Sequence, residues 1–292
     1  MLMVGRSISK LPGSRMSDGS SQPAFRSARL FERAGGPRIM GILNVTPDSF
    51  SDGGRFAAVE NAVAHARAMA AEGADVIDIG GESTRPGYQA VDAEEEIRRV
   101  VPAIRAVRQV VDAPISIDTM KARVAAAALE AGAQIVNDVW GLQRDPDIAR
   151  VAAEHGAPVV VMHHRTEVDP ALDIVEDMKR FLGRSIEIAQ KAGIPDAAIA
   201  LDPGVGFGKT VPQNLIAIRR VDALAAMGFP VLLGTSRKSL IGHIIERKPE
   251  ERVFGTVATS VLGWRQGAVM FRVHDVRANR DALLVAQAIL DA

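Results

Sequence analysis

Several things are missing from this chain, and each absence narrows what the protein can be. Its 292 residues contain no cysteine, which excludes disulfides, thiolate metal sites and a cysteine nucleophile. The lack of cysteine also fits a reducing compartment, so we expect a cytoplasmic location. No apolar run approaches the roughly 18–20 residues that a membrane-spanning helix needs, and we therefore expect no association with a membrane.

An excess of one charge and aromatic side chains are also lacking. The chain carries 35 basic and 35 acidic side chains, and only 4% of its residues are aromatic. A basic face supplies affinity for nucleic acid, and aromatic side chains supply stacking platforms for bases. We therefore expect no nucleic-acid partner. Apolar residues make up 47% of the chain, which is enough for a sizeable core.

The first 35 residues differ from the rest of the chain. They are rich in arginine and serine and lack the uninterrupted apolar stretch of a signal peptide. We expect residues 1–35 to be a disordered N-terminal extension, and two alternatives stay open. Met16 could be the true start of the chain, or the stretch could be a transit peptide, which has a similar composition.

From residue 36 onward one pattern repeats eight times. A short β-branched apolar run is followed by a polar or glycine-rich turn and then by an alanine-rich stretch. The apolar runs are nearly continuous, which is typical of parallel strands that are buried on both faces. We predict strands over Arg38–Val45, Val76–Gly80, Ile115–Asp118, Ile135–Val139, Val159–His163, Ile199–Asp202, Val231–Thr235 and Val269–His274.

The alanine-rich stretches predict helices between these strands. They include Ala57–Glu72, Glu94–Val111, Ala122–Glu130, Ile174–Ala192 and Asn214–Met227. Four of the helical stretches run into a glycine, which adopts the left-handed conformation that closes a helix at little cost. These glycines are Gly73, Gly132, Gly193 and Gly228.

Eight such units predict an α/β fold, the (β/α)8 TIM barrel, with residues 36–292 as a single domain. A doubly wound open sheet is the runner-up. It normally has fewer strands and carries a Gly-x-Gly-x-x-Gly turn after the first strand, which is absent here. The active site of a TIM barrel lies at the carboxyl ends of its strands, so we searched there for chemistry.

Every predicted strand ends in polar residues. One Asp or Asn after a strand is ordinarily a helix cap, but eight polar ends on one rim are hard to explain by capping. One set offers two carboxylates, an amide and an ammonium group, which together suit the edge of a flat heterocycle such as a pterin. Its members are Asp118, Asn137, Asp202 and Lys238. A structural ion pair is the alternative for Asp118 and Lys238.

A second set of polar residues suits an anion. It combines hydroxyl groups with cationic side chains, which would neutralise a phosphate or pyrophosphate. Its members are Ser83, Thr84, Arg85, Arg272 and His274. Arg272 and His274 are two apart on a strand, so they face the same side. His274 could instead be an ordinary structural histidine.

Three further features carry less weight. His163 and His164 are adjacent, so they would point to opposite faces of a strand, which does not favour a zinc site. The run 203–209 is rich in glycine but lacks the spacing of a phosphate-binding P-loop. The acidic run 94–96 is interpreted as a solvated helix start, which the helix dipole favours.

The polar motifs together resemble the dihydropteroate synthase family of pterin-binding TIM barrels. They follow the family order and span residues 38 to 276, and the two longest run over 40–54 and 80–87. Shorter matches lie at 118–119, 137–138, 201–204, 206–209, 236–239 and 272–276. The chain departs from the family at Val205, where Phe is common, and at 164–166, where Met-Gln-Gly is common.

This resemblance implies a reaction in folate biosynthesis. The enzyme would be a transferase that condenses 6-hydroxymethyl-7,8-dihydropterin diphosphate with p-aminobenzoate to give 7,8-dihydropteroate and diphosphate. The family is usually a homodimer, which is the assembly that we expect. Two competing functions stay open: a pterin-binding methyltransferase on a related barrel, which would not need the anion-binding set, and a paralogue that only binds pterin.

The resemblance also implies a role for each candidate residue. The pterin pocket would contain Asp118, Asn137, Met162, Asp202 and Lys238. Diphosphate would be met by Ser83, Thr84, Arg85, Arg272 and His274, and Asn44 would ligate Mg²⁺. The p-aminobenzoate site would contain Pro47, Phe207, Lys238 and Ser239. Catalysis would depend on Asp118, Lys238, Arg272 and His274.

Overall fold

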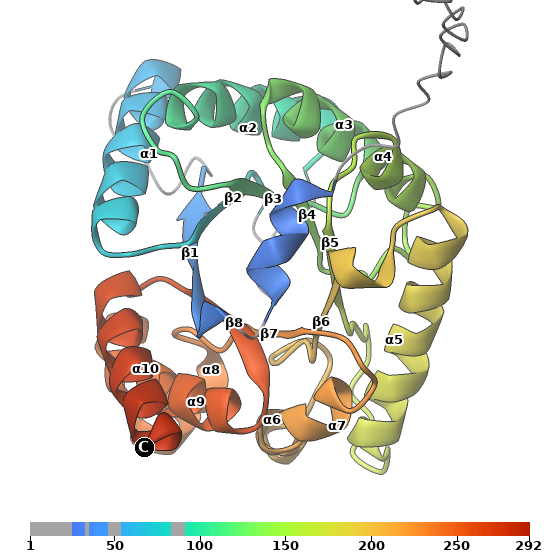
Figure 1. Ribbon diagram of the computed structural model, residues 1–292, viewed down its shortest axis with the longest axis vertical. Coiled ribbons are helices and arrows are strands. Elements are labelled where there is room, and N and C mark those ends of the chain that lie inside the picture. The colour runs from blue at the N-terminus through green and yellow to red at the C-terminus, as the bar shows by residue number, and fades with distance from the viewer. Residues whose placement is uncertain (1–24, 33–34, 46–53, 83–90) are drawn as a thin grey trace, which may run out of the picture.

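Eight parallel strands close into a barrel in the computed structural model (Figure 1), which describes residues 25–32, 35–45, 54–82 and 91–292. Each strand pairs with the next one along the chain, and β1 pairs with β8 to close the barrel. The strands are β1 Arg38–Asn44, β2 Val76–Gly80, β3 Ile115–Asp118, β4 Ile135–Asp138, β5 Val159–Met162, β6 Ile199–Asp202, β7 Val231–Leu233 and β8 Ala268–Val273. The predicted (β/α)8 barrel is confirmed, and every expected strand is present.

Helices surround the barrel and alternate with its strands. The α-helices are α1 Gly54–Ala71, α2 Ala93–Val107, α3 Ala122–Ala131, α4 Ile148–Glu154, α5 Ile174–Lys191, α6 Val211–Arg219, α7 Val221–Ala225, α8 Ser239–Ile245, α9 Val253–Arg265 and α10 Val276–Asp291. Short 3-10 helices are η1 Arg26–Phe31, η4 Asp196–Ala198 and η5 Pro249–Glu251. Among the described residues, no helix is both long and apolar enough to cross a membrane.

Two of the predicted helices differ from expectation at their ends. The single helix expected over Asn214–Met227 is two helices, because the backbone at Arg220 (φ −109°, ψ 29°) leaves the helical region between α6 and α7. Helix α2 ends at Val107, and the expected continuation to Val111 consists of turns. The four glycines expected to close helices all have positive φ angles, between 88° and 116°.

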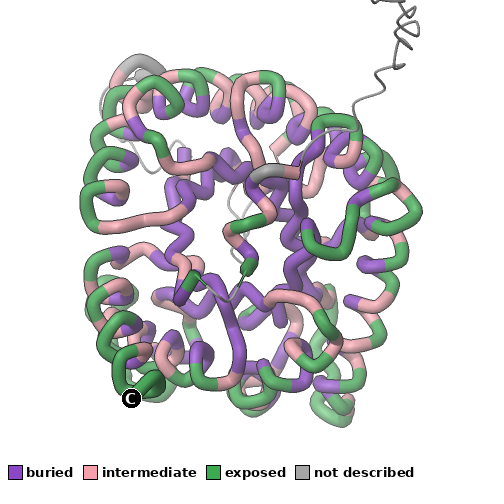
Figure 2. Tube along the Cα trace, in the orientation of Figure 1, coloured by how far each residue is buried: buried purple, intermediate pink, exposed green. Residues whose placement is uncertain are grey.

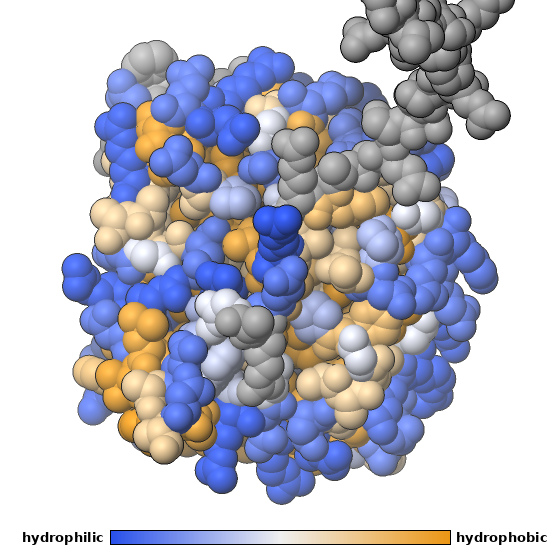
Figure 3. Space-filling view, in the orientation of Figure 1, coloured by the Kyte–Doolittle hydropathy of each residue, from blue (hydrophilic) through white to orange (hydrophobic). Residues whose placement is uncertain are grey.

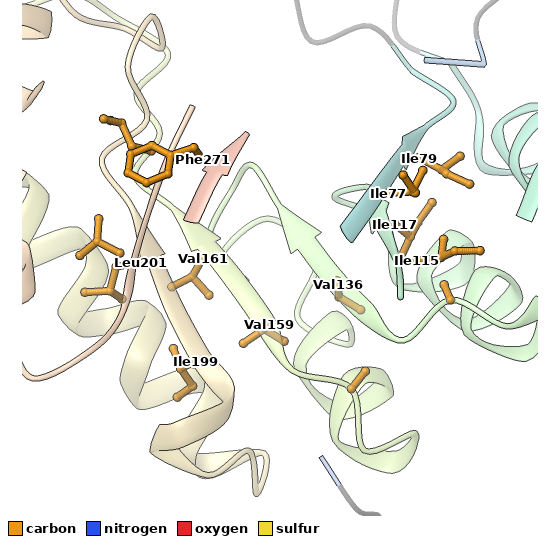
Figure 4. Packing of buried hydrophobic residues seen from close by; sticks show 14 of the residues in the cluster. Ile77, Ile79, Ile115, Ile117, Val136, Val159, Val161, Ile199, Leu201 and Phe271 are labelled. Atoms are coloured by element: carbon orange, nitrogen blue, oxygen red, sulfur yellow. The ribbon is translucent and has the colours of Figure 1, made fainter. Parts of the chain in front are cut away.

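Strand alternation divides the core into two layers. Residues that face outward pack against the helices; Figure 4 shows part of this layer, including Ile77, Ile117, Val159 and Leu201. Residues that face inward near the amino ends of the strands form a second apolar cluster inside the barrel. Figure 2 shows the resulting pattern, in which the strands are buried and the outer sides of the helices are exposed. The polar mouth therefore rests on an apolar floor.

The floor is completed by the segment before β1. In Figure 1 the helix η1, in blue, lies across the centre of the ring of strands. Phe31, at the end of η1, is 3% exposed and belongs to the inner cluster with Met40, Val160 and Met270. We expected residues 1–35 to be disordered, yet the described residues 25–32 fold against the barrel because Phe31 has an apolar site to fill. Residues 1–24 and 33–34 of that stretch lie outside the described residues.

Phe31 should therefore contribute to stability although it precedes the first strand of the barrel in the sequence. We predict that Phe31→Ala lowers the free energy of unfolding by about 3 kcal/mol, because it empties an apolar site that cannot fully collapse. Phe31→Leu, which keeps most of the volume, should cost less than about 1.5 kcal/mol. Urea unfolding of both variants measures these values. Equal stability of Phe31→Ala and the wild type would show that η1 does not close the barrel.

Candidate active site

The carboxyl ends of neighbouring strands bring the predicted pterin-reading residues together. Asp118 of β3 is in register with Asn137 of β4, and Met162 of β5 is in register with Asp202 of β6. Asn137, Met162 and Asp202 are buried, with exposed fractions of 3–6%. Because the strands are parallel and consecutive, these side chains share one mouth of the barrel.

An ion-pair network centred on Arg272 crosses this mouth. Arg272 Nε donates to Asp78 Oδ2 at 2.6 Å, and Arg272 Nη2 donates to Asp118 Oδ2 at 2.6 Å. Asp78 Oδ2 also accepts a hydrogen bond from Asn137 Nδ2 at 3.1 Å. The ion-pair partner of Asp118 is thus Arg272, 154 residues further along the chain, and not Lys238.

Burial and neighbouring charges set the protonation states within the network. Burial raises the pKa of Asp118 to about 7, against the opposing effect of Arg272 and with a further rise from Asp78. Burial disfavours the charge of Arg272, but Asp78 and Asp118 outweigh that effect and raise the pKa of Arg272 above its ordinary value. Arg272 therefore stays cationic, whereas Asp118 can change its protonation state near neutral pH.

Lys238 and Asp202 bring a second set of opposite charges to the mouth. Lys238 Nζ donates to the backbone oxygen of Val205 and lies 4.9 Å from the ring centroid of Phe207. Burial lowers the pKa of Lys238 to about 8, although Asp202 acts in the opposite direction. Burial also raises the pKa of Asp202, and Lys238 limits that rise. Asp202 Oδ1 accepts from the backbone N–H of Gly204 at 2.7 Å, which fixes the carboxylate.

The loop between β6 and α6, which carries Phe207, is held by Lys209. The buried Lys209 Nζ donates to the backbone oxygens of Gly204 at 2.7 Å and Phe207 at 3.2 Å. Burial lowers the pKa of Lys209 to about 7, with Asp202 opposing. Gly204 has a φ of 62°, and a Cβ atom there would lie 1.8 Å from the backbone oxygen of His163. Lys209 thus binds carbonyl oxygens of its own loop. This agrees with the prediction that the run 203–209 is not a phosphate-binding P-loop.

His274 and Ser239 lie at the same rim. The Ser236 hydroxyl accepts from the backbone N–H of His274 at 3.1 Å and lies 3.0 Å from its ring Nδ1. Arg237 follows Ser236 and forms a two-point ion pair with Asp275, through bonds of 3.0 and 2.6 Å. These contacts hold the β7–α8 segment against the end of β8. Ser239 is exposed at the first position of α8, directly after Lys238.

Asn44 ends β1 at the same mouth. A Cβ atom placed on Gly80 would lie 3.8 Å from Asn44 Oδ1 and 3.6 Å from Asp118 Oδ2, so both oxygens converge on the space beside Gly80. Oxygen ligands of this kind suit Mg²⁺, which usually takes one or two from the protein and the others from water and phosphate. Pro47, Ser83, Thr84 and Arg85 lie outside the described residues.

The two histidines after β5 point in different directions. His163 Nε2 lies 3.1 Å from Asp177 Oδ2 in α5, whereas the His164 ring stacks on Trp140 with centroids 3.8 Å apart. His164 also lies 5.5 Å from the ring centroid of Phe207. The atypical segment after β5 therefore adds aromatic contacts next to a predicted substrate-binding side chain. No sequence signal indicated that His164 and Trp140 would meet.

The acidic run at the start of α2 is only partly solvated. Glu94 and Glu95 pair with arginines near the surface, as expected, but Glu96 is 1% exposed and pairs with Lys121. Lys121 also pairs with Glu82. Burial raises the pKa of Glu96, and the hydrogen bond from Lys121 counteracts the rise. The expectation of a wholly solvated run was wrong for Glu96, because Lys121 of the next unit provides a buried partner.

Asp78 is the residue at the mouth that our sequence interpretation missed. It lies inside a strand that reads Val-Ile-Asp-Ile-Gly, and we considered only the residues after that strand. A carboxylate in an otherwise apolar strand is itself a signal. Its position, two before Gly80, places it on the same inward face as the residues that reach the mouth.

Comparison with known proteins identifies the family of this chain. The family model described as "pterin binding enzyme" matches residues 40–274, so the chain belongs to the pterin-binding enzyme family. A dihydropteroate synthase of Clostridium beijerinckii is 51% identical over 253 residues, covering 86% of this chain and 94% of that protein.

Solved structures show the same likeness. A dihydropteroate synthase of Clostridium difficile, solved in the presence of pteroic acid, has a TM-score of 0.85 and 51% identity, covering 87% of this chain and 97% of that one. A dihydropteroate synthase of Xanthomonas albilineans, solved with 4-aminobenzoic acid, has a TM-score of 0.85 and 47% identity, covering 88% of this chain and 94% of that one.

The burial of His163 should make stability depend on pH. Burial lowers the pKa of His163 to about 3, and ring Nδ1 has no hydrogen-bond partner among the described residues, so the folded state holds the ring neutral. An unfolded histidine has a pKa of about 6.5. The stability that His163 contributes is therefore complete above about pH 6.5 and is lost as the pH falls towards 3, by up to about 1.4 kcal/mol per pH unit.

We predict that the wild type loses about 1 kcal/mol more unfolding free energy than His163→Gln when the pH falls from about 7.5 to 5.5. Gln keeps an N–H that can donate to Asp177 but cannot take up a proton. Urea unfolding of both proteins at the two pH values measures the difference, in which the titration of groups that do not interact with His163 cancels. Identical pH dependence of the two proteins would contradict a buried neutral His163.

Proposed function

We propose that this chain is a dihydropteroate synthase, which joins the pterin methylene group to the amine of p-aminobenzoate with release of diphosphate. The observation that carries the proposal is the set of charges at the barrel mouth, in which Arg272 lies between Asp78 and Asp118 beside the Asn137 amide. Relatives with this activity match most of the chain. The cytoplasmic location remains a prediction.

The pterin ring should bind at the floor of the mouth. Its edge alternates hydrogen-bond donors and acceptors, which Asp202, Asn137 and Lys238 complement with a carboxylate, an amide and an ammonium group. Met162 is buried beside Asp202 in the strand register and offers an apolar surface to the ring. Because Asp202 and Lys238 are fixed by backbone contacts, this pocket is organised before the substrate arrives.

Catalysis then requires charge to be stabilised at both ends of the breaking bond. The C–O bond of the pterin methylene breaks, and its electron pair leaves with the diphosphate. Asp118 would stabilise the positive charge that develops on the electron-rich ring, while Arg272 and His274 would stabilise the departing anion. The neutral amine of p-aminobenzoate forms the new C–N bond and releases its proton to water, so no strong base is needed.

Mg²⁺ would be held at Asn44, whose side-chain oxygen converges with that of Asp118 beside Gly80. The ion would neutralise part of the diphosphate charge. The p-aminobenzoate ring would lie against Phe207, near Lys238, and Ser239 would meet its carboxylate from the first turn of α8. Pro47, Ser83, Thr84 and Arg85 complete the proposed set on the grounds of sequence alone.

The activity is tested by diphosphate release with and without p-aminobenzoate. We predict release that depends on both substrates, and a loss of about 100-fold or more in kcat/KM for Asp118→Asn, because the amide cannot stabilise a developing cation. Asp222→Asn, a surface carboxylate in α7, is the matched control and should keep wild-type activity. Turnover of Asp118→Asn within twofold of the wild type would remove Asp118 from the mechanism. A methyltransferase or a protein that only binds pterin would release no diphosphate.

A homodimer is the assembly we propose, on the basis of one apolar surface. Eight of the ten large hydrophobic side chains that are exposed among the described residues lie on three helices that contact one another in turn. We call this surface the α8–α10 face; it contains Ile244, Ile245, Phe254, Leu262, Leu284, Val285, Ile289 and Leu290. Figure 3 shows hydrophobic atoms gathered at the lower left, over α9 and α10. Contiguous exposed apolar surface of this kind marks an interface.

Sedimentation velocity at micromolar concentration tests this assembly. We predict a dimer for the wild type and a monomer for Phe254→Glu, because Phe254 is 83% exposed on the α8–α10 face and a charge there would be buried on association. Leu215→Glu, exposed on α6 outside that face, should remain dimeric. A monomeric wild type over the whole concentration range would contradict the proposal.

A further inference from the structure

Asp78 is a buried carboxylate whose register partners on the two neighbouring strands carry no charge. It is 0% exposed, and its register partners are Ile42 in β1 and Ser116 in β3. Burying a carboxylate is expensive unless it is paired. Asp78 is paired through Oδ2 with Arg272 and Asn137, while its Oδ1 has no hydrogen-bond partner among the described residues. Asp78 therefore calls for an explanation beyond the stability of the barrel.

We propose that Asp78 is a positioning residue that orients both the Asn137 amide and the Arg272 guanidinium, and thereby decides which hydrogen-bonding groups the pocket presents to the pterin substrate. This inference rests on the proposed function. Asp78 itself would not touch the reacting atoms.

Asp78 determines which atom of the Asn137 amide faces it. Asp78 Oδ2 already accepts a hydrogen bond from Arg272 Nε, so the atom of Asn137 that lies 3.1 Å from it is the donor, the amide nitrogen. The amide group is planar, and its oxygen is then directed away from Asp78. A charge-assisted hydrogen bond favours this orientation over the flipped one, which would set an oxygen against a carboxylate. Asp78 thus determines whether the oxygen or the nitrogen of the Asn137 amide is available to the substrate.

Asp78 also fixes the plane of the Arg272 guanidinium. Asp78 accepts a hydrogen bond from Nε–H, and Asp118 accepts one from Nη2, each at 2.6 Å. Two different carboxylates therefore fix the plane of the guanidinium. Without Asp78, Arg272 would be able to form a two-point pair with Asp118 alone, the geometry that arginine prefers with carboxylates. Such a pair would occupy both oxygens of Asp118. Asp78 keeps the guanidinium shared, which leaves one oxygen of Asp118 and other N–H groups of Arg272 for the substrate.

The test compares Asp78→Asn with Ser116→Ala. Asn keeps the shape of Asp78 but not its charge, and Ser116 lies at the same level of the barrel with a buried hydroxyl that has no partner among the described residues. Calorimetry with 6-hydroxymethyl-7,8-dihydropterin diphosphate is expected to give at least tenfold weaker binding for Asp78→Asn and binding within twofold of the wild type for Ser116→Ala. The KM for p-aminobenzoate should stay within twofold in both variants.

Affinity separates positioning from a purely structural role. A structural defect lowers the fraction of folded protein, and hence the calorimetric stoichiometry, but leaves the affinity of the folded fraction unchanged. Wild-type affinity in folded Asp78→Asn would overturn the inference. If the wild type itself bound no pterin diphosphate, the proposed function would fail instead, so the two failures are distinguishable.

A measurement on the wild type covers the case in which Asp78→Asn does not fold. With ¹⁵N-labelled asparagine, and with Asn137→Ser to assign the signal, the side-chain amide protons of Asn137 can be observed directly by NMR. We expect at least one of them to exchange with water at least tenfold more slowly than those of a surface asparagine, before any ligand is added. Exchange as fast as at the surface would show that Asp78 does not hold the amide, and would overturn the inference.

Discussion

A single buried cation shared between two carboxylates organises the mouth of this barrel. Arg272 extends from the last strand and joins Asp78 of the second strand to Asp118 of the third. The cation lowers the cost of burying two carboxylates, and the carboxylates raise the pKa of the cation. Each member of the network is therefore acceptable in the interior only because the others are present. The pterin-reading groups gather around this arrangement.

The fold was predictable because the strands of a barrel have a simple sequence pattern. Strands buried on both faces appear as continuous apolar runs, and all eight were found in this way. The carboxyl ends of such strands must meet, so polar residues after the strands predicted one site. Asp118, Asn137, Asp202 and Arg272, expected together on this ground, do lie at one mouth, as does Met162, which only the family resemblance had indicated.

The omissions have physical causes. Asp78 was missed because its strand continues beyond it, and inward-facing positions deeper in a strand also reach the pocket when a long partner such as Arg272 extends down to them. Glu96 appeared to be one of three equivalent acidic residues, and only tertiary structure reveals that Lys121 buries it. The stacking of His164 on Trp140 joins two loops that no local pattern connects. Contacts between units, and not within them, account for each case.

The apolar floor closed by Phe31 has a kinetic consequence. With the amino end of the barrel filled by Met40, Val160, Met270 and their neighbours, ligands enter and leave through the same opening. A ligand that binds at the deepest position would then have to enter before a ligand that binds above it. If two substrates lie one above the other in a cylinder sealed at one end, the deeper one has to bind first and the upper one has to leave first.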